Sequence, residues 1–179
     1  GAYNWTWIEN QKWFGGGDGT QGTPYIIENI TINGQGFWDC IRIQDSSKHF
    51  IIRNCTVYNS GFGRSAGIRL INTTNGKIIN NDLLNNFDYY IVYGIYLEDS
   101  NDNIISENTC KFNDDAIYLE DSNDNTISGN ICNDNYRAIK LEYSNGNTIS
   151  GNTCNDNDYG IHIRDYGAHN IISGNTLNG

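Results

Sequence analysis

Apolar residues in this chain alternate with polar ones in short runs, and from Gly94 onward the whole arrangement repeats every 22 residues. Residues 94–115 read GIYLEDSNDNIISENTCKFNDD, and residues 116–137, 138–159 and 160–179 repeat this pattern with few changes. Alternation indicates β-strands, and a repeat of about 20 to 30 residues without a helical stripe is typical of a parallel β-solenoid. The pattern therefore predicts an all-β solenoid in which one repeat forms one coil.

The aligned repeats also predict which side chains point inward. Residues two apart on a strand share a face, so the first strand of each coil contributes two inward columns. The first is Ile41, Ile68, Ile95, Ile117, Ile139 and Ile161, and the second is Ile43, Leu70, Leu97, Leu119, Leu141 and Ile163. Two further inward columns are predicted at Ile51, Ile79, Ile105, Ile127, Ile149 and Ile172, and at Leu84, Cys110, Cys132, Cys154 and Leu177. Each stacked Ile or Leu contributes about 1.5–3 kcal/mol, so neighbouring coils stabilise one another.

A column of asparagines precedes the last inward position of each coil. It is predicted to contain Asn29, Asn54, Asn108, Asn130, Asn152 and Asn175. Stacked amides can donate to one coil and accept from the next, so we interpret this column as a structural ladder.

The N-terminal part of the chain is less regular. The spacing from Cys40 to Gly67 and from Gly67 to Gly94 is 27 residues, so these two coils carry longer loops than the later ones. Residues 24–34 (PYIIENITING) indicate a partial coil. We expect about seven coils in a β-helix over residues 24–179, and an aromatic, Gly-rich cap or junction over residues 1–23.

The repeat pattern GIxLxxSxxNxIsgN at 94–175, preceded by PYIIENITING and IIRNCTVYNSG, resembles a known family. It is similar to the NosD-like, carbohydrate-binding and sugar-hydrolase group within the pectin-lyase-like superfold. The resemblance covers the chain from Gly19 to its end and implies a single-stranded right-handed parallel β-helix. Members of this group include polysaccharide lyases, hydrolases and epimerases, surface proteins and a periplasmic accessory protein, so the resemblance does not select one function.

The composition limits the partners and the cellular location that can be expected. The chain has no Met and a net charge of −10 with 11 basic residues. Few basic residues argue against a nucleic-acid partner, and no apolar run is long enough to insert into a membrane. We expect an exported, processed protein at the cell surface or outside the cell.

The five cysteines do not predict a disulfide framework. Cys110, Cys132 and Cys154 fall in one inward column and are expected to be buried free thiols. Cys40 and Cys55 fall in different columns, and no pairing is predicted between them.

Outward positions of the first strand offer a candidate binding face. Between and just after the two inward columns lie Tyr96, Tyr118, Lys140, His162, Glu98, Glu120 and Glu142. Tyrosine rings could stack on a sugar chain running along the helix axis while the carboxylates bind its hydroxyl groups. The alternative interpretation is a solvated β face without a ligand.

No residue is predicted to be catalytic, and no cofactor or metal site is assigned. The Asp-Asp and Gly-His-Gly constellations of the hydrolase members are missing, and Glu98, Glu120, Lys140 and His162 are the residues that a test of catalysis would change. Calcium stays open as a ligand because the Glu ladder adjoins Asp99 and Asp121, whose oxygens suit a hard cation.

Two functions follow from these patterns. The first is a non-catalytic structural module that associates with itself end to end, with Trp5, Trp7 and Trp13 forming the cap or the junction. The second is a domain that binds or cleaves a polysaccharide on the Tyr/Glu face. Asn4 and Asn72 are candidate glycosylation sites.

Overall fold

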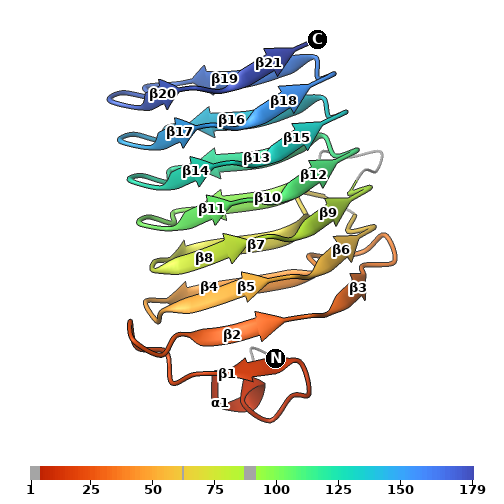
Figure 1. Ribbon diagram of the computed structural model, residues 1–179, viewed down its shortest axis with the longest axis vertical. Helices are drawn as coiled ribbons and strands as arrows, with labels where there is room; N and C mark the ends of the chain where they lie inside the picture. The colour runs from red at the N-terminus through yellow and green to blue at the C-terminus, as the bar shows by residue number, and fades with distance from the viewer. Residues whose placement is uncertain (1–4, 62, 87–91) are drawn as a thin grey trace.

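The computed structural model describes residues 5–61, 63–86 and 92–179 and forms a parallel β-helix (Figure 1). Each turn contributes one strand to each of three sheets, so strands β2 to β21 make six three-strand turns followed by two further strands. All strand pairs are parallel except that of β1 with β2. The predicted all-β solenoid is confirmed, and its coil number is close to the seven expected.

Strand bounds follow the repeats closely in the C-terminal coils. Sheet A contains β1 (Phe14–Gly16), β2 (Tyr25–Glu28), β5 (Phe50–Arg53), β8 (Gly76–Ile79), β11 (Ile104–Ser106), β14 (Thr126–Ser128), β17 (Thr148–Ser150) and β20 (Ile171–Ser173). Sheet B contains β3 (Thr31–Asn33), β6 (Thr56–Tyr58), β9 (Asp82–Leu84), β12 (Thr109–Lys111), β15 (Ile131–Asn133), β18 (Thr153–Asn155) and β21 (Thr176–Asn178). Sheet C contains β4 (Ile41–Ser46), β7 (Ala66–Thr73), β10 (Tyr93–Glu98), β13 (Asp115–Glu120), β16 (Arg137–Glu142) and β19 (Tyr159–Arg164).

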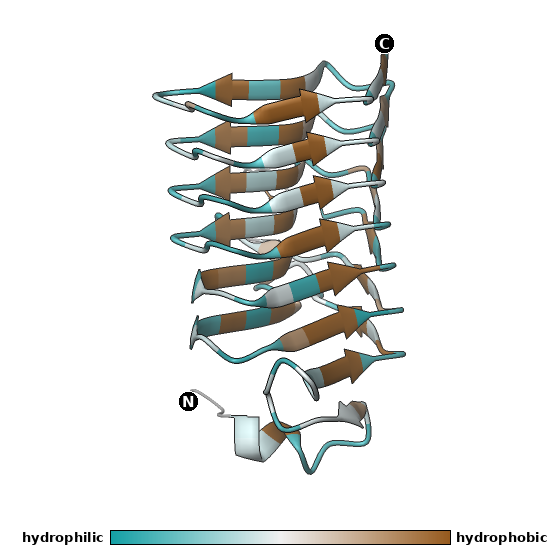
Figure 2. Ribbon diagram, turned by 60° about the vertical axis from the view of Figure 1, so that its left-hand side comes forward, coloured by the Kyte–Doolittle hydropathy of each residue, from teal (hydrophilic) through white to brown (hydrophobic). Residues whose placement is uncertain are grey.

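The core lies between the three sheets, and apolar and polar bands alternate along the strands of successive coils (Figure 2). The two predicted columns of sheet C pair residue by residue, as in Ile95 with Ile117 and Leu97 with Leu119. The other two columns needed correction in the longer coils. Ile52, Ile78 and Leu83 are fully buried, whereas the predicted Ile51, Ile79 and Leu84 are only half-buried. Adjacent strand residues face opposite sides, so a one-residue error exchanges a core side chain for a surface one.

The asparagine ladder is buried and continuous in the C-terminal coils. Its members are Asn81, Asn108, Asn130, Asn152 and Asn175. The backbone N–H and the side-chain amide of Asn108 both donate to Oδ1 of Asn130 at 3.0 Å, and the same pattern repeats along the column. Two further ladders, which the sequence analysis missed, run through Asn103, Asn125, Asn147 and Asn170 and through Asn86, Asn113, Asn135 and Asn157.

The placement of Asn29 and Asn54 in the ladder was wrong. Both are exposed and occupy corners, with φ angles of 57° and 53°. Asn tolerates this left-handed conformation, which is why it resembles a ladder residue in the sequence. The ladder position next to Asn54 belongs to Cys55, whose backbone N–H donates to Oδ1 of Asn81 at 3.0 Å.

The segment before the first coil packs against its N-terminal end. Helix α1 (Trp5–Ile8) carries Trp5, whose ring stacks on Tyr25 at 4.6 Å and whose Nε1 donates to Ser46 Oγ at 3.1 Å. Strand β1 pairs antiparallel with β2 and covers that edge of sheet A. Sheets B and C end at β3 and β4, and no described strand pairs with those two edges.

All five cysteines are free, and Cys110, Cys132 and Cys154 are buried in one interior column. Asn72 is exposed, and its amide donates to Asp45 Oδ1 at 2.9 Å, whereas Asn4 lies outside the described residues. Among the residues that the structure describes, no helix has the length and apolar character needed to cross a bilayer.

Candidate binding face

The outer face of sheet C carries three columns of side chains. Parallel pairing places residues of equal register side by side, so each column runs along the helix axis. The middle column contains Arg42, Arg69, Tyr96, Tyr118, Lys140 and His162. The columns on either side contain Ala66, Tyr93, Asp115, Arg137 and Tyr159, and Gln44, Ile71, Glu98, Glu120, Glu142 and Arg164.

Tyr96 and Tyr118 do not form an open stacking surface. Their rings are parallel, 5.0 Å apart, and 0% and 1% exposed. Tyr93 packs against both rings, and the guanidinium of Arg69 lies 4.8 Å from the centre of the Tyr96 ring. Arg64, from the insertion between β6 and β7, donates to the Tyr96 hydroxyl at 3.0 Å. The expected exposure of these two tyrosines was wrong, because residues outside the repeat cover them.

Each buried phenol is tied to a carboxylate of the next coil. Tyr118 donates to Glu142 Oε2 at 2.9 Å, and Tyr96 donates to Glu120, which also binds Arg64. Burial raises the pKa of both phenols, and their hydrogen bonds to these carboxylates raise it further. Both tyrosines therefore stay protonated and act as hydrogen-bond donors that hold the carboxylates in place.

Glu98 is also engaged, because Arg69 Nη2 lies 2.5 Å from Glu98 Oε2. Each of the three glutamates in this column is therefore paired with a cation. Glu98 pairs with Arg69, Glu120 with Arg64 and Glu142 with Lys140. No group of three or more His, Cys, Asp or Glu side chains among the described residues is arranged to hold a metal ion.

Lys140 is buried rather than exposed, which corrects a further part of the predicted face. Its Nζ lies 2.7 Å from Glu142 Oε2 and 4.1 Å from the centre of the Tyr118 ring. Beside it, Arg137 pairs with Asp115, which is fully buried. Burial raises the pKa of Asp115 against the opposing effect of Arg137.

The face is open at its two ends, at Arg42 and Gln44 of β4 and over β19. His162 is half-buried, and its ring stacks on Tyr159 at 5.4 Å. Asp115 Oδ2 and His162 Nδ1 are buried and find no hydrogen-bond partner among the described residues. We call Lys140, Glu142, His162 and Arg164 the polar strip, since they lie side by side on β16 and β19.

Two exposed tyrosine pairs flank the polar strip. Tyr136 and Tyr159 meet edge to face at 5.5 Å, immediately before β16 and at the start of β19. Tyr143 and Tyr166 lie 6.4 Å apart, just beyond the ends of the same two strands. The four side chains are 44%, 48%, 44% and 89% exposed. A six-residue strand spans about 20 Å, so the pairs are separated by the length of β16.

Electrostatics favour an ionised Glu142 in this strip. Burial raises its pKa, but hydrogen bonds from Lys140 and Tyr118 and the charge of Arg164 lower it more, so the net shift is downward. Glu142 is therefore an acceptor at neutral pH, while Lys140 and Arg164 are donors.

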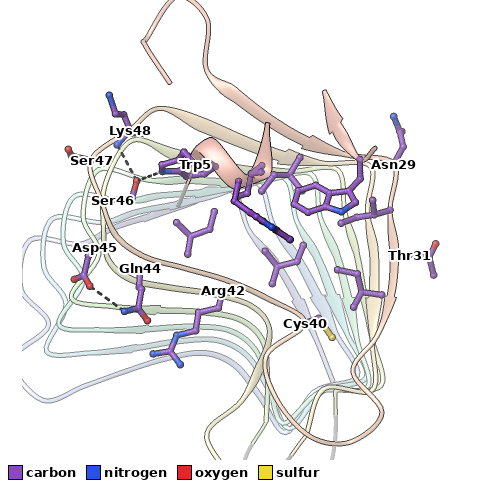
Figure 3. A pocket seen from close by; sticks show the side chains of 18 residues that line it. Trp5, Asn29, Thr31, Cys40, Arg42, Gln44, Asp45, Ser46, Ser47 and Lys48 are labelled. Atoms are coloured by element: carbon purple, nitrogen blue, oxygen red, sulfur yellow. Dashed lines mark hydrogen bonds between the residues drawn. The ribbon is translucent and has the colours of Figure 1, made fainter. Parts of the chain in front are cut away.

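The three tryptophans of the N-terminal segment lie at the opposite end of the molecule. Trp5, Trp7 and Trp13 line one side of a cavity of about 1300 Å³, and the first turn of the β-helix lines the other (Figure 3). Trp5 contacts the first coil directly, so the segment covers part of that end.

Comparison with known proteins places the chain in a family. A family described as right-handed beta helix region matches residues 16–177. The chain belongs to this right-handed β-helix family. No curated protein sequence is similar enough to this β-helix to count as a match.

Several solved structures share the fold of this β-helix. The periplasmic alginate epimerase AlgG has a TM-score of 0.70 and 18% identity, over 86% of this chain and 45% of its own. The enzymatically active domain of tailspike protein 2 from bacteriophage CBA120 has a TM-score of 0.61 and 13% identity, over 85% of this chain and 31% of its own. The A-module of the mannuronan C-5 epimerase AlgE6 from Azotobacter vinelandii has a TM-score of 0.57 and 15% identity, over 86% of this chain and 52% of its own. The chain thus spans about half the length of these structures or less, and the likeness concerns the fold.

The flanking tyrosines were absent from the sequence-based site. The sequence did contain a signal for Tyr143. The two preceding repeats read LEDS at this point, whereas the repeat with Tyr143 reads LEYS, so a tyrosine takes the place of an aspartate. Tyr136 and Tyr159 lie at the ends of repeats, where the pattern is weakest. Arg64 lies in the longer loop of a 27-residue coil, outside the 22-residue repeat.

Proposed function

We propose that this β-helix binds a polysaccharide across the outer face of β16 and β19. The observation that carries the proposal is the pair of exposed tyrosine clusters on either side of the polar strip. The sugar chain would run parallel to the strands, rather than along the helix axis as the sequence analysis expected.

The chemistry of the surface suits such a ligand. Tyrosine rings combine an apolar face with a polar hydroxyl group, so the two pairs can each stack on a sugar ring. Between them, Lys140 and Arg164 donate hydrogen bonds and Glu142 accepts them, which matches the mixed hydrogen bonding of sugar hydroxyl groups.

The fold comparisons support the same choice. The similar structures include alginate and mannuronan epimerases and a phage tailspike, which act on polysaccharides or are named as enzymatically active. They favour a carbohydrate ligand over the structural, end-to-end module. They also favour an exported protein, since one of them is named periplasmic.

We assign binding rather than hydrolysis to this face. A glycosidase needs one carboxylic acid that stays protonated near neutral pH. The pKa of Glu142 is shifted downward, and Glu98 and Glu120 are held in ion pairs with Arg69 and Arg64. Glu142 is therefore suited to accept hydrogen bonds and not to protonate a leaving group, and the oxygens of Glu98 and Glu120 are occupied by their arginine partners.

Affinity electrophoresis in gels that contain alginate or dextran tests the proposal. The double variant Tyr136→Ala, Tyr159→Ala and the double variant Tyr143→Asn, Tyr166→Asn should each weaken retention by about tenfold or more, since aromatic stacking is lost. Asn suits the second pair because Tyr143 and Tyr166 have φ angles of 51° and 59°. Phe112→Asn removes a similarly exposed ring, also at a left-handed φ of 58°, from another face and should leave retention unchanged. Unchanged retention of both double variants, or no retention of the unaltered protein on either glycan, would refute the proposal.

A further inference from the structure

The N-terminal end of the β-helix is incompletely covered. Strand β1 pairs with β2, but no described strand pairs with the terminal edge of β4. The cavity of about 1300 Å³ lies along this edge, between β4 and the tryptophans of the N-terminal segment (Figure 3). An unpaired edge presents free backbone N–H and C=O groups to any extended chain that reaches it.

The cavity is larger than a usual small-molecule site and follows the strand β4, of which six residues line it. Its volume exceeds the range of about 300–1,000 Å³ that is usual for small-molecule sites. Ile41 and Ile43 of β4 form its apolar wall, while Arg42 and Gln44 between them are exposed on the outer face. A strand added to β4 would therefore present alternate residues to an apolar interior and to solvent.

Charge indicates which residues should occupy the solvent-facing positions. Arg42 lies beside Arg69 in the parallel ladder, and Arg69 already pairs with Glu98. Among the described residues no carboxylate lies within ion-pair distance of Arg42 or Lys48, which both line the cavity. Asp45 also lines the cavity, but its oxygens accept hydrogen bonds from Gln44 and Asn72. At this edge the two unpaired cations therefore favour an acidic partner, although the chain as a whole has a net charge of −10.

We propose that the edge of β4 binds an extended peptide segment of alternating apolar and acidic residues, by addition of a parallel or antiparallel strand to sheet C. The site is separate from the polysaccharide face and does not depend on it. Main-chain hydrogen bonds to β4 would supply affinity, the contacts with Ile41 and Ile43 would set the register, and Arg42 would select acidic side chains.

A second copy of this chain fits the edge less well. Continuing the core columns would place β19 on β4, with Ile161 and Ile163 next to Ile41 and Ile43. That register sets His162 beside Arg42 and Arg164 beside Gln44, so neither pair joins opposite charges. In addition, β1 occupies the edge of sheet A onto which β20 would have to stack.

Titration with blocked synthetic hexapeptides tests the inference. The probe is Ala-Ile-Glu-Leu-Glu-Asp, and the controls are Ile-Leu-Ala-Glu-Glu-Asp, which lacks the alternation, and Ala-Ile-Lys-Leu-Lys-Asn, which reverses the charge. Hydrogen exchange of the β4 amides and the fluorescence of Trp5 and Trp13 report occupancy. We expect the probe alone to protect the β4 amides and to change the fluorescence with a saturable dependence.

A charge-reversed variant sharpens the test. Arg42→Glu should weaken binding of the acidic probe by about tenfold or more and make the basic peptide the better ligand, because Arg42 is exposed and its replacement should leave the fold intact. Lys77→Glu, on the exposed face of sheet A, is the matched control and should not change the preference. Three outcomes would overturn the inference: no peptide protects β4, the three peptides bind equally, or sedimentation shows that the β4 amides are protected only in self-associated protein.

Discussion

At the scale of single residues, Glu142 connects three consecutive coils. It accepts a hydrogen bond from Tyr118 of the preceding coil, forms an ion pair with Lys140 of its own strand, and lies 3.7 Å from Nε of Arg164 in the following coil. Lys140 is buried, and its ion pair among the described residues is with Glu142. The stability of the face should therefore respond to the ionisation of Glu142.

Replacing Glu142 with Gln should reduce stability and flatten its pH dependence. A carboxylate whose pKa is lower in the folded state stabilises the fold above its ordinary value of 4.5, and this contribution is lost as the pH falls through the folded value. Urea denaturation from about pH 7 to about pH 3 should show a steeper loss for the unaltered protein than for Glu142→Gln. At neutral pH the variant should be less stable by about 1–3 kcal/mol, because the buried Lys140 loses the negative charge that compensates its own. Glu107→Gln, at an exposed position, should follow the unaltered protein, and equal slopes for all three proteins would contradict this account.

At the scale of the strand, register decides which of two adjacent apolar residues enters the core. In β8, Ile78 pairs with Ile105 and Ile52 and is fully buried, while Ile79 faces outward and is half-buried. The same choice arises in β9, where Leu83 and not Leu84 aligns with Cys110.

Alanine substitutions in β8 test which of the two isoleucines, Ile78 or Ile79, lies in the core. Ile78→Ala should destabilise the protein by about 2–5 kcal/mol, because a buried column loses a side chain between two filled neighbours. Ile79→Ala should cost about 1 kcal/mol or less, since its side chain already contacts solvent. Urea denaturation of both variants measures the difference, and an equal or reversed order would show that the register assigned to β8 is wrong.

Sequence periodicity predicted the strands well where coils have equal length. From β10 onward, hydrophobic spacing alone identified the inward residues of sheet C, because each Ile or Leu there is followed by a polar or aromatic neighbour. In the 27-residue coils, Ile51 and Ile52 are equally apolar, so hydrophobicity could not decide between them. The burial of Tyr96 was beyond this reasoning, since it depends on Arg64, a residue outside the repeat.

At the scale of the whole molecule, positive charge is concentrated on one face of an acidic protein. Five of the 11 Lys and Arg residues project from the outer face of sheet C, namely Arg42, Arg69, Arg137, Lys140 and Arg164. The remaining surface carries most of the carboxylates, which accounts for the net charge of −10. The same columns hold four carboxylates, Glu98, Asp115, Glu120 and Glu142, so this face is close to electrically neutral. An anionic polysaccharide would therefore meet less repulsion on sheet C than on the rest of the surface.

The coil is also the unit by which the molecule can be shortened. Deleting residues 138–159 removes one 22-residue repeat and joins Arg137 to Gly160, so every inward column keeps its register. The shortened protein should fold cooperatively. The m-value of its urea denaturation should be lower by roughly an eighth, because less surface is exposed on unfolding. Deleting residues 138–148 removes half a repeat and should abolish cooperative unfolding. Failure of the full-coil deletion to fold would show that the coils are not interchangeable.

The direction of the inter-coil hydrogen bonds has a mechanical consequence. Neighbouring coils are joined by strand pairs and asparagine ladders that run along the long axis, and α1 and β21 lie at opposite ends of that axis (Figure 1). Tension applied between the two ends would act along these hydrogen bonds and break them one coil at a time. This is the unzipping geometry, in contrast to the shear geometry, in which all the bonds between two strands are loaded together. Each 22-residue coil that opens releases about 75 Å of extended chain. Under load the protein would therefore lengthen one coil at a time, in even steps over the 22-residue coils and longer ones over the 27-residue coils, while the coils that remain folded keep their shape.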